Sequence, residues 1–267
     1  MEIIEILKKK VVKKTKIVDA PEDKKAFDKV ALKALGVLDM VIAFDTTGSM
    51  AAYIDAVRKE VAELVPRLFK NNENLRLGIV AFGDYCDMEN AQTFGKAYQC
   101  LMPTDNENDI IKFIRETQDT SGGDGDEFYE LVIKKIVEET PRRADATKAI
   151  LLISDAEPHP LGYTYKDYVV GNQIDWRLEA KKAAEQMIKI DTVTITDASW
   201  YKELSRMTNG ISVPFESGYK TGRLVEAATM SRGSMKSRMM FDEMAESCVD
   251  PEMAAVFDSY RSERNDV

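Results

Sequence analysis

Three short, continuous apolar runs constrain the fold of this chain more than any other feature of its sequence. They are MVIAF (40–44), LRLGIVAF (75–82) and KAILLISD (148–155), the last ending in a polar pair. Continuous apolar runs of this length are typical of strands that are covered on both faces. Between the runs, apolar residues recur at helical spacing, as they do over 54–68 and 128–139. This alternation predicts an α/β fold with a doubly wound, mostly parallel sheet and helices on both faces.

Weaker patterns fill in the remaining elements. The segment YQCLM (98–102) predicts a short edge strand, and TVTIT (192–196) and ISVPF (211–215) predict two further strands. NENDIIKFIRETQ (106–118) predicts a helix, with Asn106 or Asn108 as its N-cap.

The composition of the two ends sets them apart from the centre. We expect a lysine-rich N-terminal extension (1–36), one α/β domain (37–230) and a methionine-rich helical C-terminal extension (231–267), with two helices broken at Pro251. The N-terminal lysines form either a docking patch for an acidic partner or a solvated helix face. The C-terminal methionines form either an adaptable partner surface or a helix that packs on its own domain.

Charge and cysteine usage narrow the classes of function. The net charge of −9 argues against nucleic acid as the main partner. Since the sequence shows neither a membrane-length apolar run nor the apolar core of a signal peptide, we expect a cytoplasmic location. Cys86, Cys100 and Cys248 form no CxxC pair, which predicts free thiols, although a Cys86–Cys100 bridge is conceivable in a secreted setting. His159 is the sole histidine and cannot support a histidine-rich metal site, so we expect any metal to be held by oxygen, which points to Mg²⁺, Mn²⁺ or Ca²⁺ rather than zinc.

Polar side chains follow the apolar runs where the predicted strands end. Asp45, Thr47 and Ser49 follow the first run, and Asp155 follows the third; Asp124 lies in the glycine-rich loop TSGGDGDE (120–127) between them. The carboxyl ends of parallel strands share one edge of a sheet, so these loops should converge. Carboxylates and hydroxyls together suit a hard cation better than a phosphate. We also expect Gly48 to adopt a backbone conformation that few other residues tolerate.

FDTTGSM (44–50) resembles the Asp-x-Ser/Thr-x-Ser metal-ion-dependent adhesion site of von Willebrand factor A (vWA) domains. The segments GIVAFGDYCD (78–87), TSGGDGDE and LLISDAEPH (151–159) extend the likeness, and the set looks most like the vWA domains linked to alpha-kinases. The resemblance covers about residues 37–230.

By this resemblance, the metal ligands are Asp45, Thr47, Ser49, Asp124 and Asp155, with Asp155 binding directly or through water. Most vWA domains have threonine where this chain has Asp124, and Thr120 is an alternative ligand. The alpha-kinase-linked group has Pro-Glu where this chain has Asp126-Glu127. Three carboxylates against a divalent ion would hold the ion firmly and make it less attractive to an acidic partner.

Four more residues match the alpha-kinase-linked pattern: Asp84, Cys86, Asp87 and His159. Asp84 could approach the same edge of the sheet. We expect it to order a loop or to support the metal ligands rather than to bind the metal directly.

The resemblance implies a non-catalytic, divalent-cation-binding protein-interaction module in an intracellular multi-protein assembly, without the kinase part of its relatives. The partner would bind through a carboxylate at the metal or through the terminal extensions; we expect no membrane or nucleic-acid partner.

A purely structural metal, which only holds the three loops together, is another interpretation. A metal-dependent phosphatase or nuclease is the catalytic alternative, but phosphatases of the haloacid-dehalogenase type need a second aspartate where this chain has Thr47. Neither a GxxxxGK[ST] nor a GxGxxG motif follows any of the predicted strands, which argues against nucleotide binding of the usual kinds.

Overall fold

A six-stranded sheet forms the centre of the molecule. The computed structural model describes residues 36–89, 96–166, 168–169 and 173–265. The strand order is β10-β9-β5-β1-β2-β3, and every neighbouring pair is parallel except β2 and β3. The strands are β1 (Leu38–Asp45), β2 (Leu75–Phe82), β3 (Tyr98–Thr104), β5 (Thr147–Ser154), β9 (Ile188–Thr194) and β10 (Ser212–Pro214). The predicted mostly parallel sheet with an edge strand near residue 100 is therefore confirmed.

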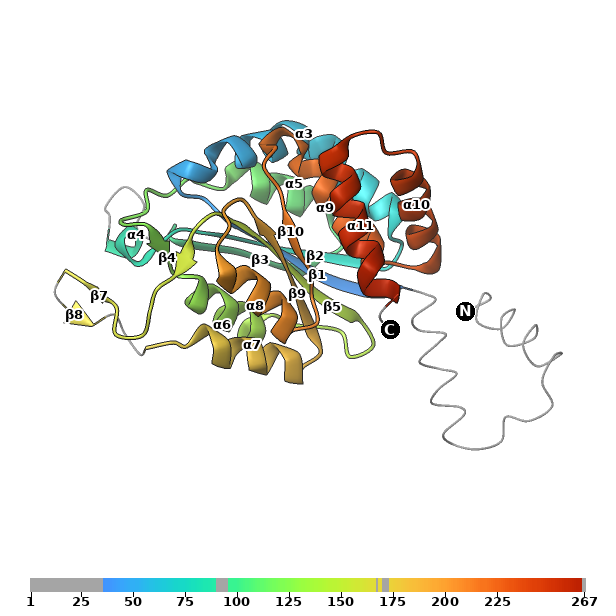
Figure 1. Ribbon diagram of the computed structural model, residues 1–267. Helices are drawn as coiled ribbons and strands as arrows, with labels where there is room; N and C mark the ends of the chain where they lie inside the picture. The colour runs from blue at the N-terminus through green and yellow to red at the C-terminus, as the bar shows by residue number, and fades with distance from the viewer. Residues whose placement is uncertain (1–35, 90–95, 167, 170–172, 266–267) are drawn as a thin grey trace.

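Helices cover both faces of this sheet, as the doubly wound prediction requires (Figure 1). One layer contains α3 (Ala51–Asn71), α5 (Glu107–Glu116), α9 (Thr221–Arg232), α10 (Met235–Glu246) and α11 (Pro251–Asn265). The other contains α6 (Tyr129–Glu139), α7 (Trp176–Glu185) and α8 (Ser199–Met207). Asn106 caps α5 as expected, because its side chain accepts a hydrogen bond from the Asn108 N–H. None of the helices in the described ranges has both the length and the apolar character needed to cross a membrane.

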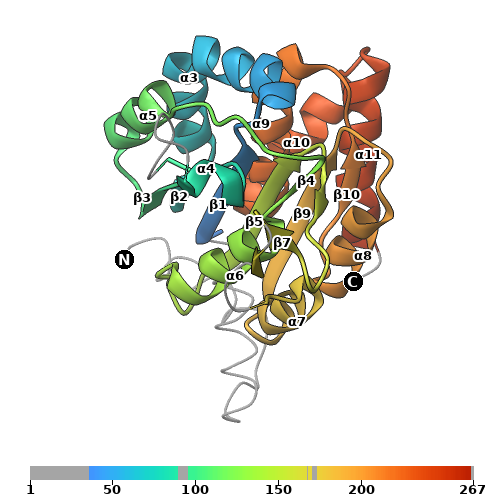
Figure 2. The same cartoon turned by 90° about the vertical axis from the view of Figure 1, so that its left-hand side faces the viewer.

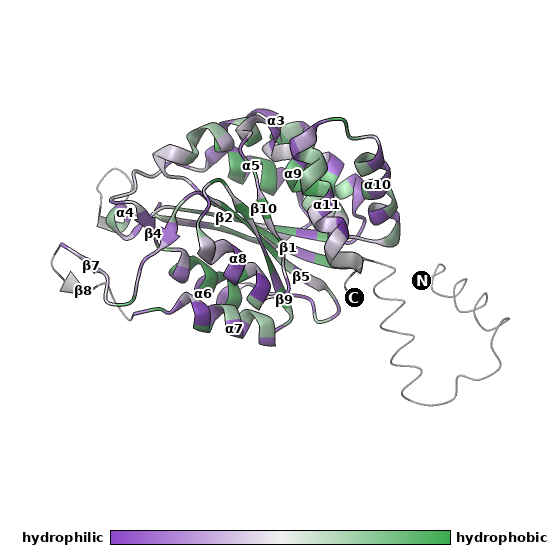
Figure 3. Ribbon diagram, viewed as in Figure 1, coloured by the Kyte–Doolittle hydropathy of each residue, from purple (hydrophilic) through white to green (hydrophobic). Residues whose placement is uncertain are grey.

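Each face of the sheet has its own apolar core. Along β1, Met40 and Ile42 pack under the first layer, whereas Val41 and Ala43 pack under the second. A continuous apolar run serves both cores because successive side chains point to opposite faces. Figure 3 shows the resulting hydrophobic strands between two helix layers with more polar outer surfaces.

Strand β9 starts at Ile188, four residues before the predicted strand 192–196. Lys189 and Asp191 interrupt the apolar pattern there, although Asp191 is completely buried. Its carboxylate pairs with Arg232 at the end of α9. The sequence pattern missed this start because the partner of the buried charge lies far along the chain.

The predicted C-terminal extension packs on the domain. Helices α10 and α11 contact α9, and α11 also contacts β10. Met253 is fully buried, Met240 and Met244 pack partly against the core, and Met235 and Met239 are exposed. Packing on the domain thus accounts for three of these methionines. The predicted lysine patch lies outside the described residues.

Short elements decorate the edge at which β1 and β5 end. They are η1 (Gly48–Met50), α4 (Tyr85–Glu89), β4 (Asp126–Glu127), β6 (Glu157–Pro158), β7 (Thr164–Tyr165) and β8 (Tyr168–Val169); η2 (Gly218–Lys220) precedes α9. Strand β4 pairs with β6 in parallel, which joins the glycine-rich loop to the loop after β5.

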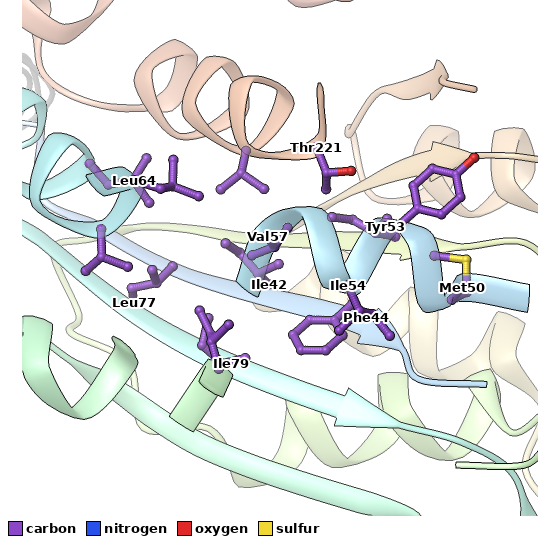
Figure 4. A pocket seen from close by; sticks show the side chains of 15 residues that line it. Ile42, Phe44, Met50, Tyr53, Ile54, Val57, Leu64, Leu77, Ile79 and Thr221 are labelled. Carbon is purple, nitrogen blue, oxygen red and sulfur yellow. The ribbon is translucent and has the colours of Figure 1, made fainter. Parts of the chain in front are cut away.

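An apolar cavity of about 40 Å³ lies between α3 and the strands β1 and β2 (Figure 4). Side chains such as Ile42, Val57 and Ile79 line it, and Thr221 and Tyr53 contribute its few polar atoms. Cavities with such walls stay dry. The polar chemistry of the molecule lies elsewhere, at the carboxyl edge of the sheet.

Candidate metal centre

Three loops meet at the carboxyl edge of the sheet, and Figure 2 looks onto this edge. The first loop follows β1, the middle loop (residues 117–128) precedes α6, and the third follows β5. The Thr46 hydroxyl donates to the Phe82 carbonyl at 2.7 Å and lies 3.0 Å from the Thr120 hydroxyl. The Thr120 N–H also donates to the Thr46 carbonyl. Thr120, the alternative ligand, thus joins the first loop to the middle loop.

Asp45 is completely buried at the end of β1. Its Oδ1 accepts the Thr47 N–H at 2.7 Å, and its Oδ2 accepts the Tyr129 hydroxyl at 3.0 Å. Burial raises the pKa of Asp45 to about 6, although these hydrogen bonds oppose the rise. Tyr129 was not among the predicted site residues, because its place in an apolar helix pattern suggests only core packing.

Three other predicted ligands lie around Asp45. The Thr47 and Ser49 hydroxyl oxygens are 3.3 Å apart. Phe44 pairs with Ile153, so Asp45 and Asp155 leave neighbouring strands at nearly the same level. The negative charge of Asp155 contributes to the raised pKa of Asp45. The structure therefore brings Asp45, Thr47, Ser49 and Asp155 to one place.

Asp124, the fifth predicted ligand, lies with a different group of side chains. Its Oδ2 accepts the Tyr163 hydroxyl at 3.0 Å, and its Oδ1 accepts the Asp126 N–H at 3.1 Å. Potential ligand atoms of Asp124, Asp84 and His159 lie within 4.8 Å of one another. Ligation by Asp124 of an ion at Asp45 stays a prediction.

Glu127 is a buried carboxylate of the middle loop that the sequence analysis did not include among the ligands. A Cβ atom on Gly122 would lie 3.0 Å from Glu127 Oε1 and 3.2 Å from Thr47 Cγ2, so both side chains flank Gly122. Burial, followed by the charge of Asp45, raises the pKa of Glu127 to about 10. Its Oε2 is buried without a hydrogen-bond partner. The available signal was the glutamate at this position in the alpha-kinase-linked pattern.

Asp87 holds the middle loop in place. Its carboxylate accepts the Ser121 N–H at 2.9 Å, the Ser121 hydroxyl at 2.7 Å and the Gly122 N–H at 3.2 Å. It also accepts the Asp84 N–H at 3.1 Å. Asp87 thus orders the middle loop, a role that the sequence pattern suggested for Asp84 instead.

In the loops of this centre, Gly122 rather than Gly48 has a backbone conformation that other residues rarely adopt, so the expectation for Gly48 was wrong. Gly122 has a φ of 64°, a left-handed conformation that strains other residues. Gly48 is not among the positive-φ glycines, and a Cβ there would meet nothing within 4 Å. Gly48 begins η1, whose compact turn forms with ordinary backbone angles.

This difference predicts opposite outcomes for two alanine substitutions. Gly122→Ala should lower the free energy of unfolding by about 1–3 kcal/mol, because alanine is strained at positive φ and Cβ would crowd Glu127. Gly48→Ala should change it by less than about 0.5 kcal/mol. Urea denaturation of both variants measures the difference. Equal losses of stability would contradict this account of the two turns.

The charge balance of the centre suits a cation. Among the described residues, neither Asp45 nor Glu127 forms an ion pair with lysine or arginine, and acidic neighbours raise both pKa values. Buried carboxylates without a positive partner are costly. Carboxylate oxygens, a pair of hydroxyl groups and an unpartnered Glu127 oxygen are together a suitable donor set for Mg²⁺.

Comparison with known proteins identifies the family. The model of the von Willebrand factor type A domain matches residues 39–219, which is more than half of the chain. A curated relative, "Putative ariadne-like RING finger protein R811" of Acanthamoeba polyphaga mimivirus, is 22% identical over 193 residues. The match covers 68% of this chain but only 18% of the length of that relative.

Two solved structures are similar at low sequence identity. Proximal thread matrix protein 1 from the mussel byssus has a TM-score of 0.52 at 15% identity, covering 72% of this chain and 47% of that one. An aerotolerance-related membrane protein from Bacteroides fragilis has a TM-score of 0.49 at 13% identity, covering 72% and 98%. With a family match that spans β1 to η2, and with the sheet topology described above, this chain belongs to the von Willebrand factor type A domain family.

Proposed function

We propose that this chain is a non-catalytic protein-interaction module that binds a divalent cation at a metal-ion-dependent adhesion site. Asp45, Thr47, Ser49 and Asp155 would hold the ion, and Glu127 would join them from the middle loop. Mg²⁺ is the expected ion, with Mn²⁺ or Ca²⁺ as alternatives. The observation that carries the proposal is the buried pair Asp45 and Glu127, which adjoins two hydroxyl groups and has no cationic partner among the described side chains.

The expected role in protein interaction has support from the family, whose members are commonly interaction modules. In the mimivirus relative, the similar stretch is a small part of a longer RING finger protein. We infer that this chain likewise acts within a cytoplasmic multi-protein assembly and that its partner supplies any catalytic activity.

The ion would order the surface that a partner contacts. Asp45, Asp155 and Glu127 would present three negative charges to two positive ones, so the ion keeps little attraction for a further carboxylate. We therefore propose that the partner recognises the loops around the ion more than the ion itself.

Thermal unfolding tests this cation site. Mg²⁺ added to EDTA-treated protein should raise the Tm, because an ion at 100 times its Kd stabilises the folded state by about 2.7 kcal/mol. Asp45→Ala should abolish the Mg²⁺-dependent rise. Asp145→Ala, the same change at an exposed residue before β5, should preserve it.

Two outcomes would contradict the proposal. An equal Mg²⁺-dependent rise in the wild type and the Asp45→Ala variant would place the ion elsewhere. Hydrolysis of p-nitrophenyl phosphate or of DNA that requires both Mg²⁺ and Asp45 would replace the non-catalytic assignment with the enzyme alternative.

A further inference from the structure

A second group of metal-ligand side chains lies beside the proposed cation site. Asp84 follows β2, Asp124 lies in the middle loop, and His159 follows β6. Each offers an oxygen or nitrogen atom within 4.8 Å of the other two. Three segments far apart in the sequence therefore present two carboxylates and one imidazole to a common point.

The carboxylate of Asp84 lacks part of its expected hydrogen bonding. Its side chain has no exposed surface, and its Oδ1 lies 2.6 Å from His159 Nε2. Its Oδ2 is buried without a hydrogen-bond partner. An unpartnered buried carboxylate oxygen is costly and points to a missing positive ligand.

One imidazole is insufficient to balance the negative charge of this region. Asp84, Asp124 and Glu130 all act on His159 and raise its pKa, although burial opposes the rise. Burial and the charge of Asp84 in turn help to raise the pKa of Glu130 to about 7. Within the described ranges, none of these three carboxylates forms an ion pair with lysine or arginine.

Aromatic side chains hold the three groups in position. The Tyr163 ring stacks on the His159 ring with centroids 3.6 Å apart, while the Tyr163 hydroxyl donates to Asp124. The centroid of the Tyr85 ring lies 5.5 Å from that of His159 and 5.9 Å from that of Tyr163, and the Tyr85 hydroxyl donates to Glu130 at 2.7 Å. The Tyr163 hydroxyl orients the Asp124 carboxylate as hydrogen-bonding groups around metal ligands do, whereas His159 Nδ1 is buried without a hydrogen-bond partner, so stacking alone orients the ring on that side.

We propose that Asp84, Asp124 and His159 form a second metal site, for a first-row divalent cation such as Zn²⁺. Imidazole favours Zn²⁺ and related ions over Mg²⁺, whereas the two carboxylates suit either class. The ion would take the place of the proton between Asp84 and His159, with a small separation of these two groups. Its ligands differ from those proposed for the first site.

The single histidine of the chain gives a specific test. In ¹⁵N-labelled protein without a histidine tag, the imidazole nitrogen signals report on His159 alone. One equivalent of Zn²⁺ should shift the signal of the coordinating nitrogen, and Mg²⁺ should not. The Asp45→Ala variant should respond to Zn²⁺ like the wild type, so the result does not depend on the first site.

Loss of one carboxylate should weaken the Zn²⁺ response. Asp84→Asn and Asp124→Asn should each lower the Zn²⁺ affinity of His159 by about 10-fold or more. Asp124 is exposed, so its substitution tests the site even where the buried Asp84 change disturbs folding. Asp145→Asn should leave the Zn²⁺ affinity unchanged.

Two results would overturn the second site. His159 signals that respond to pH but not to Zn²⁺ would show that Asp84 and His159 form an internal ion pair only. A Zn²⁺ shift of equal affinity in the wild type and in the folded Asp124→Asn variant would show that His159 binds the ion without this carboxylate.

Discussion

Replacement of Arg232 with methionine should lower the free energy of unfolding by about 3–5 kcal/mol, because it leaves a buried carboxylate without its partner. Asp191 is completely buried in β9, and the Arg232 side chain is only 5% exposed. Arg232 Nε donates to Asp191 Oδ2 at 2.7 Å, and a second guanidinium nitrogen donates to Oδ1. Denaturant unfolding monitored by circular dichroism measures the loss.

A matched control and a double variant separate the effect of the unpaired buried charge on stability from the effect of lost side-chain packing. Lys202→Met removes a pair with Asp197 at 2.9 Å, but both side chains are largely exposed, so the loss should stay below about 1 kcal/mol. Adding Asp191→Asn to Arg232→Met should restore part of the stability. Asparagine removes the buried charge and keeps an oxygen to accept the Ile211 N–H. Equal losses of unfolding free energy in Arg232→Met and Lys202→Met would show that the buried ion pair contributes no more to stability than an exposed one.

Glu127→Gln should stabilise the metal-free protein at pH 8 by about 1–3 kcal/mol, because burial raises the pKa of Glu127 to about 10 in the fold. The unfolded chain releases this proton near pH 4.5, whereas the folded state retains it. In EDTA, the stability that Glu127 contributes is therefore fully present below about pH 4.5 and is lost progressively as the pH rises toward 10. Glutamine does not titrate, so the variant avoids this loss.

The same substitution should have the reverse effect when Mg²⁺ is present. A carboxamide brings no charge to the ion, so Mg²⁺ should raise the free energy of unfolding of Glu127→Gln less than that of the wild type. Urea unfolding at pH 5 and pH 8, with EDTA or Mg²⁺, measures both effects. Glu157→Gln, at the exposed residue of β6 opposite Asp126, should behave like the wild type. A Glu127→Gln variant with wild-type pH dependence in EDTA would contradict the placement of Glu127 in a buried acidic site.

The sequence by itself determined the layers of the fold and the first loop of the site. Continuous apolar runs specify strands that are covered on both faces, because the side chains on both faces of such a strand must be buried. Strand β2, for example, coincides with the predicted run 75–82. Asp45, Thr47 and Ser49 lie within one short turn, so local spacing was enough to predict that they cluster.

Only the tertiary structure decided which distant groups meet. Asp124 and Glu127 are three residues apart, and the sequence pattern favoured the first. The positive φ of Gly122, the hydrogen bonds that Asp87 accepts from this loop and the pairing of β4 with β6 place Glu127 and Thr47 on either side of Gly122, while Asp124 lies with Asp84 and His159. In the same way, Asp191 in β9 finds Arg232 only through the packing of α9 on the sheet. The environment of a polar side chain is set by long-range contacts, whereas the periodicity that defines strands and helices is local and can be read directly from the sequence.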